Sequence, residues 1–83
     1  MALDYRPLRA VTAREMGAAL VRDGFKLARQ KGSHRRYVHP DGRRVTVTYH
    51  RSGDTFEIKT LRSMIERQAR WTEDDLLRLE LMT

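Results

Sequence analysis

The chain has 83 residues, of which 40% are hydrophobic and 34% are charged, and its formal net charge is +6 at pH 7. This length allows one small domain, 1–83, with a thin core, and the absence of cysteine excludes disulfide bonds and thiolate metal sites. With no long apolar run and no apolar N-terminal segment, the sequence predicts a cytoplasmic protein with no membrane partner, and the basic balance is typical of proteins that bind polyanions.

The N-terminal part of the chain predicts an arm followed by one helix. Residues 1–11 lack hydrophobic periodicity and indicate a loose arm. Thr12 and Glu15 have the spacing of a capping box, in which each side chain accepts a hydrogen bond from the backbone of the other residue. Apolar residues at helical intervals then predict a helix over 13–22, and Gly24 supplies the left-handed conformation that ends it.

The middle of the chain predicts three strands joined by short turns. Alternation of apolar and polar residues favours strands over 25–30, 34–39 and 44–50. Lys31-Gly32-Ser33 forms a turn between the first two strands. Pro40-Asp41-Gly42, between the last two, is a stronger turn signal, because proline and aspartate suit the centre of a type I turn and glycine suits the left-handed position after it.

The C-terminal part of the chain predicts two helical segments. Residues 51–59 indicate a loop, and Thr60 is a candidate N-cap for a helix over 61–69. A second segment, 72–82, opens with acidic residues, which the helix dipole favours in a first turn. Its leucines either cover the core or form a docking edge for a partner; they are Leu76, Leu77, Leu79 and Leu81.

The predicted order of elements is α-β-β-β-α plus a short C-terminal helix, which places the chain in the α+β fold class. Strands joined by short turns form a three-stranded antiparallel meander, and such a sheet needs helices on only one face. This is the layout of a double-stranded-RNA-binding-domain-like fold, here over residues 12–70. A fold alone does not determine a function.

The Pro40-Asp41-Gly42 turn also predicts the register of the last two strands. If these residues form the loop, His39 lies opposite Arg43, and side chains alternate between the two faces of the sheet from that pair onward. The predicted core face carries Tyr37, Val45, Val47 and Tyr49. The predicted open face carries His34, Arg36, Arg44, Thr46, Thr48 and His50.

His34 follows a turn and lies among basic residues, and three interpretations of it stay open. A lone histidine is often a residue without a chemical role. On a basic open face it is also what a metal-free ribonuclease needs, because an imidazole with an ordinary pKa of about 6.5 acts as base or acid at neutral pH. The same face suits a plain RNA-binding surface. The spacing of His34, His39 and His50 fits no compact ligand set, so we expect no metal.

Several motifs of the chain occur together in a known family. They are Asp23-Gly24-Phe25, Gly32-Ser33-His34-x-x-Tyr37, His39-Pro40-Asp41-Gly42-Arg43, Val45-Thr46-Val47, His50 and Thr60-Leu61-Arg62-Ser63-Met64-Ile65. In this order they resemble the HicA toxin family, which comprises small mRNA interferases of bacterial type II toxin–antitoxin systems. The resemblance covers residues 12–70, most of the chain.

The resemblance implies an endoribonuclease that cleaves mRNA and arrests translation, and we expect it to use no cofactor. It also implies a HicB-type antitoxin that covers the active site in a hetero-oligomeric complex. The catalytic histidine of the family falls on His34, and the glycine that precedes it falls on Gly32. A non-catalytic RNA-binding module with the same fold is the alternative, and it would bind RNA in a salt-dependent manner without forming a product.

The neighbours of His34 on the predicted open face and in the preceding turn give the remaining site predictions. Cationic side chains suit phosphate oxygens, and a glycine lets the backbone approach them. The predicted RNA- and phosphate-binding residues are Lys31, Gly32, Ser33, Arg36, Arg44 and His50. His50 is also a candidate second proton-transfer group, because it shares the face of His34.

Overall fold

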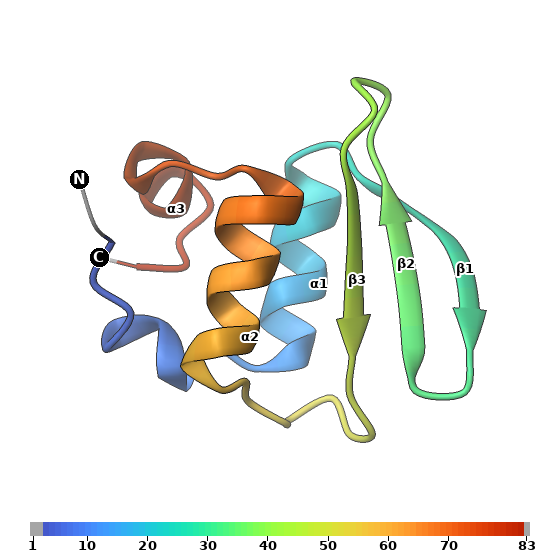
Figure 1. The fold of residues 1–83 in the computed structure, drawn as a ribbon, viewed down its shortest axis with the longest axis horizontal. Helices are drawn as coiled ribbons and strands as arrows, with labels where there is room; N and C mark the ends of the chain where they lie inside the picture. The colour runs from blue at the N-terminus through green and yellow to red at the C-terminus, as the bar shows by residue number, and fades with distance from the viewer. Residues whose placement is uncertain (1–2, 83) are drawn as a thin grey trace.

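The computed structural model describes residues 3–82 (Figure 1). Its elements are η1 Pro7–Ala10, α1 Ala13–Arg22, β1 Lys26–Lys31, β2 His34–Val38, β3 Arg44–Thr48, α2 Ile58–Arg62, η2 Ser63–Ala69 and α3 Glu73–Arg78. η1 is a 3-10 helix, and η2 continues α2 with π-helical turns. The predicted α+β class is confirmed, and the element order is compatible with a double-stranded-RNA-binding-domain-like layout. No helix within the described residues is long and apolar enough to cross a membrane.

The sheet has the strand order β1-β2-β3, and neighbouring strands run antiparallel. The predicted register between β2 and β3 is confirmed by the observed pairs, which are His34↔Thr48, Arg35↔Val47, Arg36↔Thr46, Tyr37↔Val45 and Val38↔Arg44. Beyond them, the His39 N–H donates to the Arg43 carbonyl over 2.9 Å. Gly42 has the left-handed φ of 99° that the predicted turn requires.

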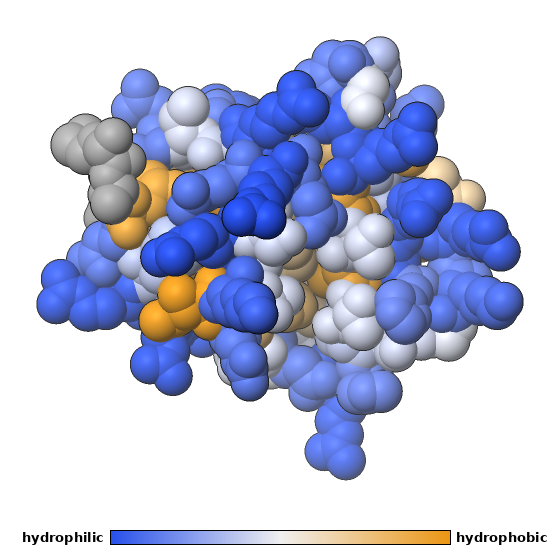
Figure 2. All heavy atoms as spheres, in the orientation of Figure 1, coloured by the Kyte–Doolittle hydropathy of each residue, from blue (hydrophilic) through white to orange (hydrophobic). Residues whose placement is uncertain are grey.

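Helices cover one face of the sheet and leave the other open. Figure 1 shows α1 and α2 on the same side of the strands, with β1 farthest from α2. Val45 and Val47 are buried and join one core with Leu20 of α1 and Ile65 of η2. All six residues of β1 are exposed, and Figure 2 shows mostly hydrophilic side chains on the surface that faces the viewer. On β2, His34 and Arg36 of the open face are exposed, whereas Tyr37 on the face toward the helices is buried.

The N-terminal segment differs from the loose arm that the sequence predicts. Tyr5, Leu8 and Val11 are buried in the core, and the Tyr5 hydroxyl donates to the Glu66 carboxylate. These apolar residues recur every three positions, which suits the 3-10 helix Pro7–Ala10. Three apolar residues in so short a segment are buried only by contacts with residues distant in the sequence. The local sequence pattern therefore does not predict their burial. Residues 1–2 of the predicted arm lie outside the described residues.

The helix after the sheet begins earlier than predicted. Its N-cap is Glu57 instead of Thr60, which lies inside α2, and Arg70 ends η2 with a left-handed φ of 56°. Glu57 makes no capping hydrogen bond with its side chain, so the sequence carries no capping signal at the true start. In the α3 segment, three leucines are buried and cover the core, and one is exposed; the buried ones are Leu76, Leu79 and Leu81, and the exposed one is Leu77.

The predicted capping box of α1 is confirmed and gives a stability prediction. The Glu15 N–H donates to Thr12 Oγ1 over 3.2 Å, and the Thr12 N–H donates to Glu15 Oε1 over 2.9 Å. We expect Thr12→Ala to lower the free energy of unfolding by about 1 kcal/mol and the Tm by about 5 °C. Thr60→Ala removes the same atoms from inside α2, so thermal melting of that variant should show no loss. Equal losses in the two variants would contradict the capping role.

Candidate active site on the open face of the sheet

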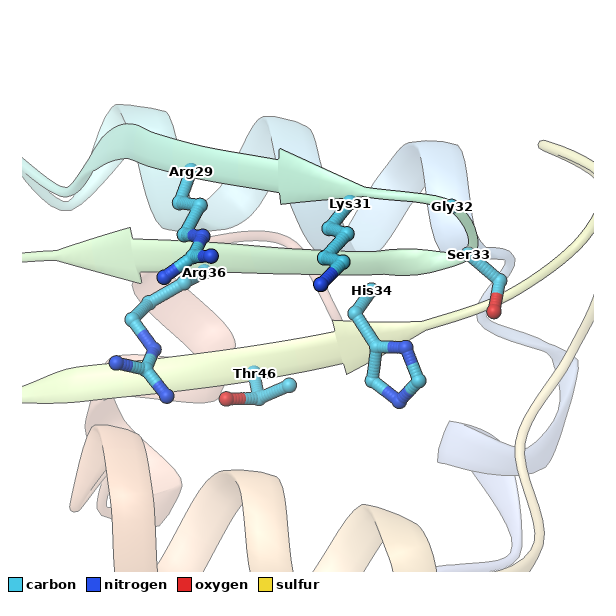
Figure 3. Close-up of a pocket in the computed structure, with 7 residues that line it drawn as sticks. All are labelled: Arg29, Lys31, Gly32, Ser33, His34, Arg36 and Thr46. Carbon is cyan, nitrogen blue, oxygen red and sulfur yellow. The ribbon is translucent and has the colours of Figure 1, made fainter.

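A pocket on the open face surrounds His34 (Figure 3). Its volume is about 480 Å³, which lies in the range of small-molecule sites. The residues that line it come from all three strands and from the turn between β1 and β2; they are Arg29, Lys31, Gly32, Ser33, His34, Arg36 and Thr46. Figure 3 shows Arg29 and Lys31 on β1 reaching across the face of the sheet toward β3.

The turn between β1 and β2 places a lysine directly beside His34. Only Gly32 and Ser33 separate the two strands, and Lys31 pairs with His34. Gly32 has a φ of 58°, and glycine at the first central position is typical of a two-residue hairpin turn. No atom lies within 4 Å of the position a Cβ would take on Gly32, so its backbone conformation, and not crowding, favours glycine there.

The opposite wall of the pocket is fixed through the edge of β3. The Thr46 N–H donates to Gln68 Oε1 over 2.8 Å, and Gln68 Nε2 donates to Ser63 Oγ over 3.0 Å. These bonds attach η2 to β3 and fix the position of Thr46 in this wall of the pocket. Arg35 faces the other side of the sheet, where its guanidinium stacks over the Tyr49 ring at 4.0 Å. Of the two consecutive arginines, only Arg36 therefore lines the pocket.

Unlike Arg43 and Arg78, the three cations of the pocket have no acidic partner within residues 3–82. Arg43 pairs with Asp23 and Asp41, and Arg78 pairs with Asp23 and Asp75. Among the ion pairs within residues 3–82, none includes Arg29, Lys31 or Arg36. Three unneutralised cations on one face create a strong positive potential that attracts anions.

The structure brings most of the predicted site residues together and leaves two outside the pocket. Lys31, Gly32, Ser33 and Arg36 line it with His34, whereas Arg44 and His50 do not; Arg44 pairs with Val38 at the other end of β3, and His50 lies beyond the strand. The His50 N–H donates to the Asp54 carboxylate. The role of Arg44 and His50 in RNA binding stays a prediction.

Two residues of the pocket, Arg29 and Thr46, are not among the site residues that the sequence predicts. The predicted register already placed Thr46 on the open face, but gave it no role. Arg29 is different, because alternation continued from the buried Phe25 would have placed it on the core face. The signal that could have found it is its spacing from Lys31, counted back from the turn.

His39 has a structural role apart from the pocket. Its Nε2 lies 3.0 Å from the Asp23 carbonyl oxygen, its Nδ1 accepts from the Asp41 N–H over 3.1 Å, and its ring packs edge-on against Phe25. A side chain held at both nitrogens is not free to bind RNA. Within residues 3–82 there is no group of three or more His, Cys, Asp or Glu side chains arranged to hold a metal ion.

Comparison with known proteins relates the chain to a protein family. The family described as the HicA toxin of bacterial toxin–antitoxin matches residues 13–71, which include α1, the whole sheet and η2. A search of curated proteins finds no match. Because the match spans most of the chain and includes every residue of the pocket, the chain belongs to the HicA toxin family.

Proposed function

We propose that this toxin is an endoribonuclease that cleaves mRNA in the cytoplasm and so arrests translation. One observation carries the proposal: an exposed histidine lies in a pocket with three cations and no carboxylate. RNA presents a phosphodiester anion with a hydroxyl beside it. The three cations of the pocket attract the phosphodiester anion, and the histidine supplies a base for the neighbouring hydroxyl.

The reaction that these groups support uses the 2′-hydroxyl of the RNA as nucleophile. The His34 imidazole removes the proton of that hydroxyl, and the 2′-oxygen attacks the neighbouring phosphorus. The bond from phosphorus to the 5′-oxygen breaks, and the 5′-oxygen leaves with a proton from an acid. The products are a 2′,3′-cyclic phosphate and a 5′-hydroxyl. Because the nucleophile belongs to the substrate, the step needs no metal-bound water.

The remaining residues of the pocket suit the phosphate in this step. Lys31 lies directly opposite His34 on the neighbouring strand, where its ammonium faces the negative charge that develops on the phosphate oxygens. Arg36 donates to the same oxygens, and Gly32 lets the backbone approach them. Since His50 does not line the pocket, Lys31 or a water molecule is the better source of the proton for the leaving oxygen.

We further propose that a HicB-type antitoxin covers this pocket in a hetero-oligomeric complex. A partner that covers three unpaired cations gains most by presenting carboxylates to them. We expect the Kd of the complex to rise with salt concentration, because screening weakens these contacts. Calorimetric titration at several ionic strengths measures the dependence. A Kd that does not respond to salt would argue for an apolar contact elsewhere on the toxin.

Induced expression in bacteria distinguishes the nuclease from a non-catalytic RNA-binding module with the same fold. If the chain is a nuclease toxin, induction stops growth, full-length mRNA disappears, and His34→Ala restores both. If it is a binding module, expression is harmless or sequesters RNA without shortening it, and the histidine makes no difference. Northern analysis of an abundant mRNA after induction gives the readout.

A further inference from the structure

A β-bulge in β1 determines which side chains of this strand face the pocket. Near its start, Leu27 pairs with Tyr37, but Arg29 pairs with Arg36, so Ala28 is an extra residue between the two pairs. In a regular strand, Leu27 and Arg29 would share one face. The bulge places Leu27 opposite the buried Tyr37 and Arg29 on the open face beside His34.

The bulge also creates an arrangement that is unfavourable without a ligand. Arg29 and Arg36 lie directly opposite each other on neighbouring strands, and like charges at such positions destabilise a sheet. Figure 3 shows both guanidiniums on the same face, on the side of the pocket away from the turn. Neither forms an ion pair with an acid within residues 3–82. An anion between two guanidiniums converts this repulsion into attraction.

We infer that Arg29 is a phosphate-binding residue of this toxin and forms, together with Arg36, a two-arginine clamp for the RNA backbone. The fork of a guanidinium matches two oxygens of one phosphate, which an ammonium does not. Arg29 and Arg36 lie at one end of the pocket, and Lys31 lies beside His34 at the other. A phosphate held by the two arginines therefore has a fixed position relative to the imidazole. The inference rests on the proposed function for the role of His34, but RNA binding tests it separately.

The test is a binding measurement with a short, fully 2′-O-methylated RNA oligonucleotide, which lacks the nucleophile and cannot be cleaved by the proposed route. Fluorescence anisotropy gives Kd between about 50 and 200 mM salt for the wild-type chain and three variants. Arg29→Ala removes the guanidinium, and Arg29→Lys keeps the charge without the fork. The double variant Arg29→Gln/Gln30→Arg keeps the composition and moves the guanidinium one residue along, to the other face of the sheet.

We expect Arg29→Ala to raise Kd about tenfold and to reduce the slope of log Kd against log salt by about 0.7. Arg29→Lys should recover the slope but only part of the affinity. The double variant should bind as weakly as Arg29→Ala, although its net charge equals that of the wild type. Thermal melting checks that the variants fold, and β1, with six exposed residues, offers little core to disturb.

Two results would overturn the clamp: a Kd for folded Arg29→Ala within about twofold of wild type, or a double variant that binds like wild type, which would mean that only net charge matters. Cleavage of unmodified RNA is assayed separately. If Arg29 governs binding in this way and the wild-type chain cleaves no RNA, the clamp stands and the proposed nuclease function fails.

Discussion

Replacement of His34 by alanine is expected to lower the rate of RNA cleavage by about 10²- to 10⁴-fold, the usual contribution of a positioned base or acid. The substitution should leave the fold intact, because His34 is exposed and its side chain makes no hydrogen bond to the rest of residues 3–82. It should also leave RNA affinity nearly unchanged, since the cations of the pocket remain in place.

Single-turnover cleavage of a short RNA by purified wild type and His34→Ala, both in excess over the RNA, measures this loss. Anisotropy with the 2′-O-methylated RNA and thermal melting serve as controls for binding and folding. The pocket of about 480 Å³ is large enough to admit free imidazole, so added imidazole should restore part of the rate to His34→Ala. A variant that cleaves as fast as wild type would remove His34 from the mechanism.

The second large effect is expected at Asp23, which joins three parts of the chain. Its carboxylate accepts from Trp71 Nε1 and from Arg78 Nη2, each over 2.8 Å, and lies 3.3 Å from Arg43 Nη1. The side chain is only 9% exposed. The end of α1, the loop between β2 and β3 and the segment around α3 are therefore held by a single carboxylate.

Asp23→Ala should lower the free energy of unfolding by about 3 kcal/mol, because it leaves the indole N–H of the buried Trp71 without its acceptor and takes one of two carboxylate partners from both Arg43 and Arg78. The corresponding fall in Tm is about 15 °C. Asp23→Asn keeps an acceptor for Trp71 and should lose less. Asp74→Ala is the matched control, since this exposed acid on α3 forms no ion pair within residues 3–82. Equal melting temperatures for Asp23→Ala and Asp74→Ala would contradict the role of Asp23.

Lowering the pH tests the charge of the Asp23 carboxylate without removing its side chain. Burial raises the pKa of Asp23, but the hydrogen bonds from Trp71 and Arg78 and the charge of Arg43 outweigh it and hold the pKa below 3.8. The ionised carboxylate thus stabilises the fold above its unfolded pKa, and this contribution is lost as pH falls through the lower folded pKa. The stability difference between wild type and Asp23→Asn should narrow below about pH 4. A difference that stays constant to lower pH would show that the charge is unimportant.

The parts of the fold that the sequence predicts well are those set by local chemistry. Pro40-Asp41-Gly42 permits one kind of turn, and the turn determines the register that places Arg36 and Thr46 on the face of His34. The capping residues Thr12 and Glu15 likewise define the start of α1 without reference to the rest of the molecule.

The parts that the sequence does not predict depend on distant contacts. Tyr5 and Leu8 become core residues only because the chain returns beside them, with Glu66 of η2 as the partner of the Tyr5 hydroxyl. Arg29 joins the pocket only because β1 contains a bulge. Because of the bulge, Phe25 is buried while Arg29 is exposed on the open face. The alternation of apolar and polar residues does not indicate where in the strand such a bulge lies.

The most direct test of the catalytic account is cleavage of two matched RNAs by the purified wild-type chain in EDTA. One RNA is unmodified, and the other carries a single 2′-deoxynucleotide at the position that is cleaved. If His34 activates the 2′-hydroxyl, the unmodified RNA yields a 2′,3′-cyclic phosphate and a 5′-hydroxyl, and the deoxy-substituted RNA stays intact at that position. Cleavage of the deoxy-substituted RNA at the same bond, or cleavage only after a divalent metal is restored, would contradict the account.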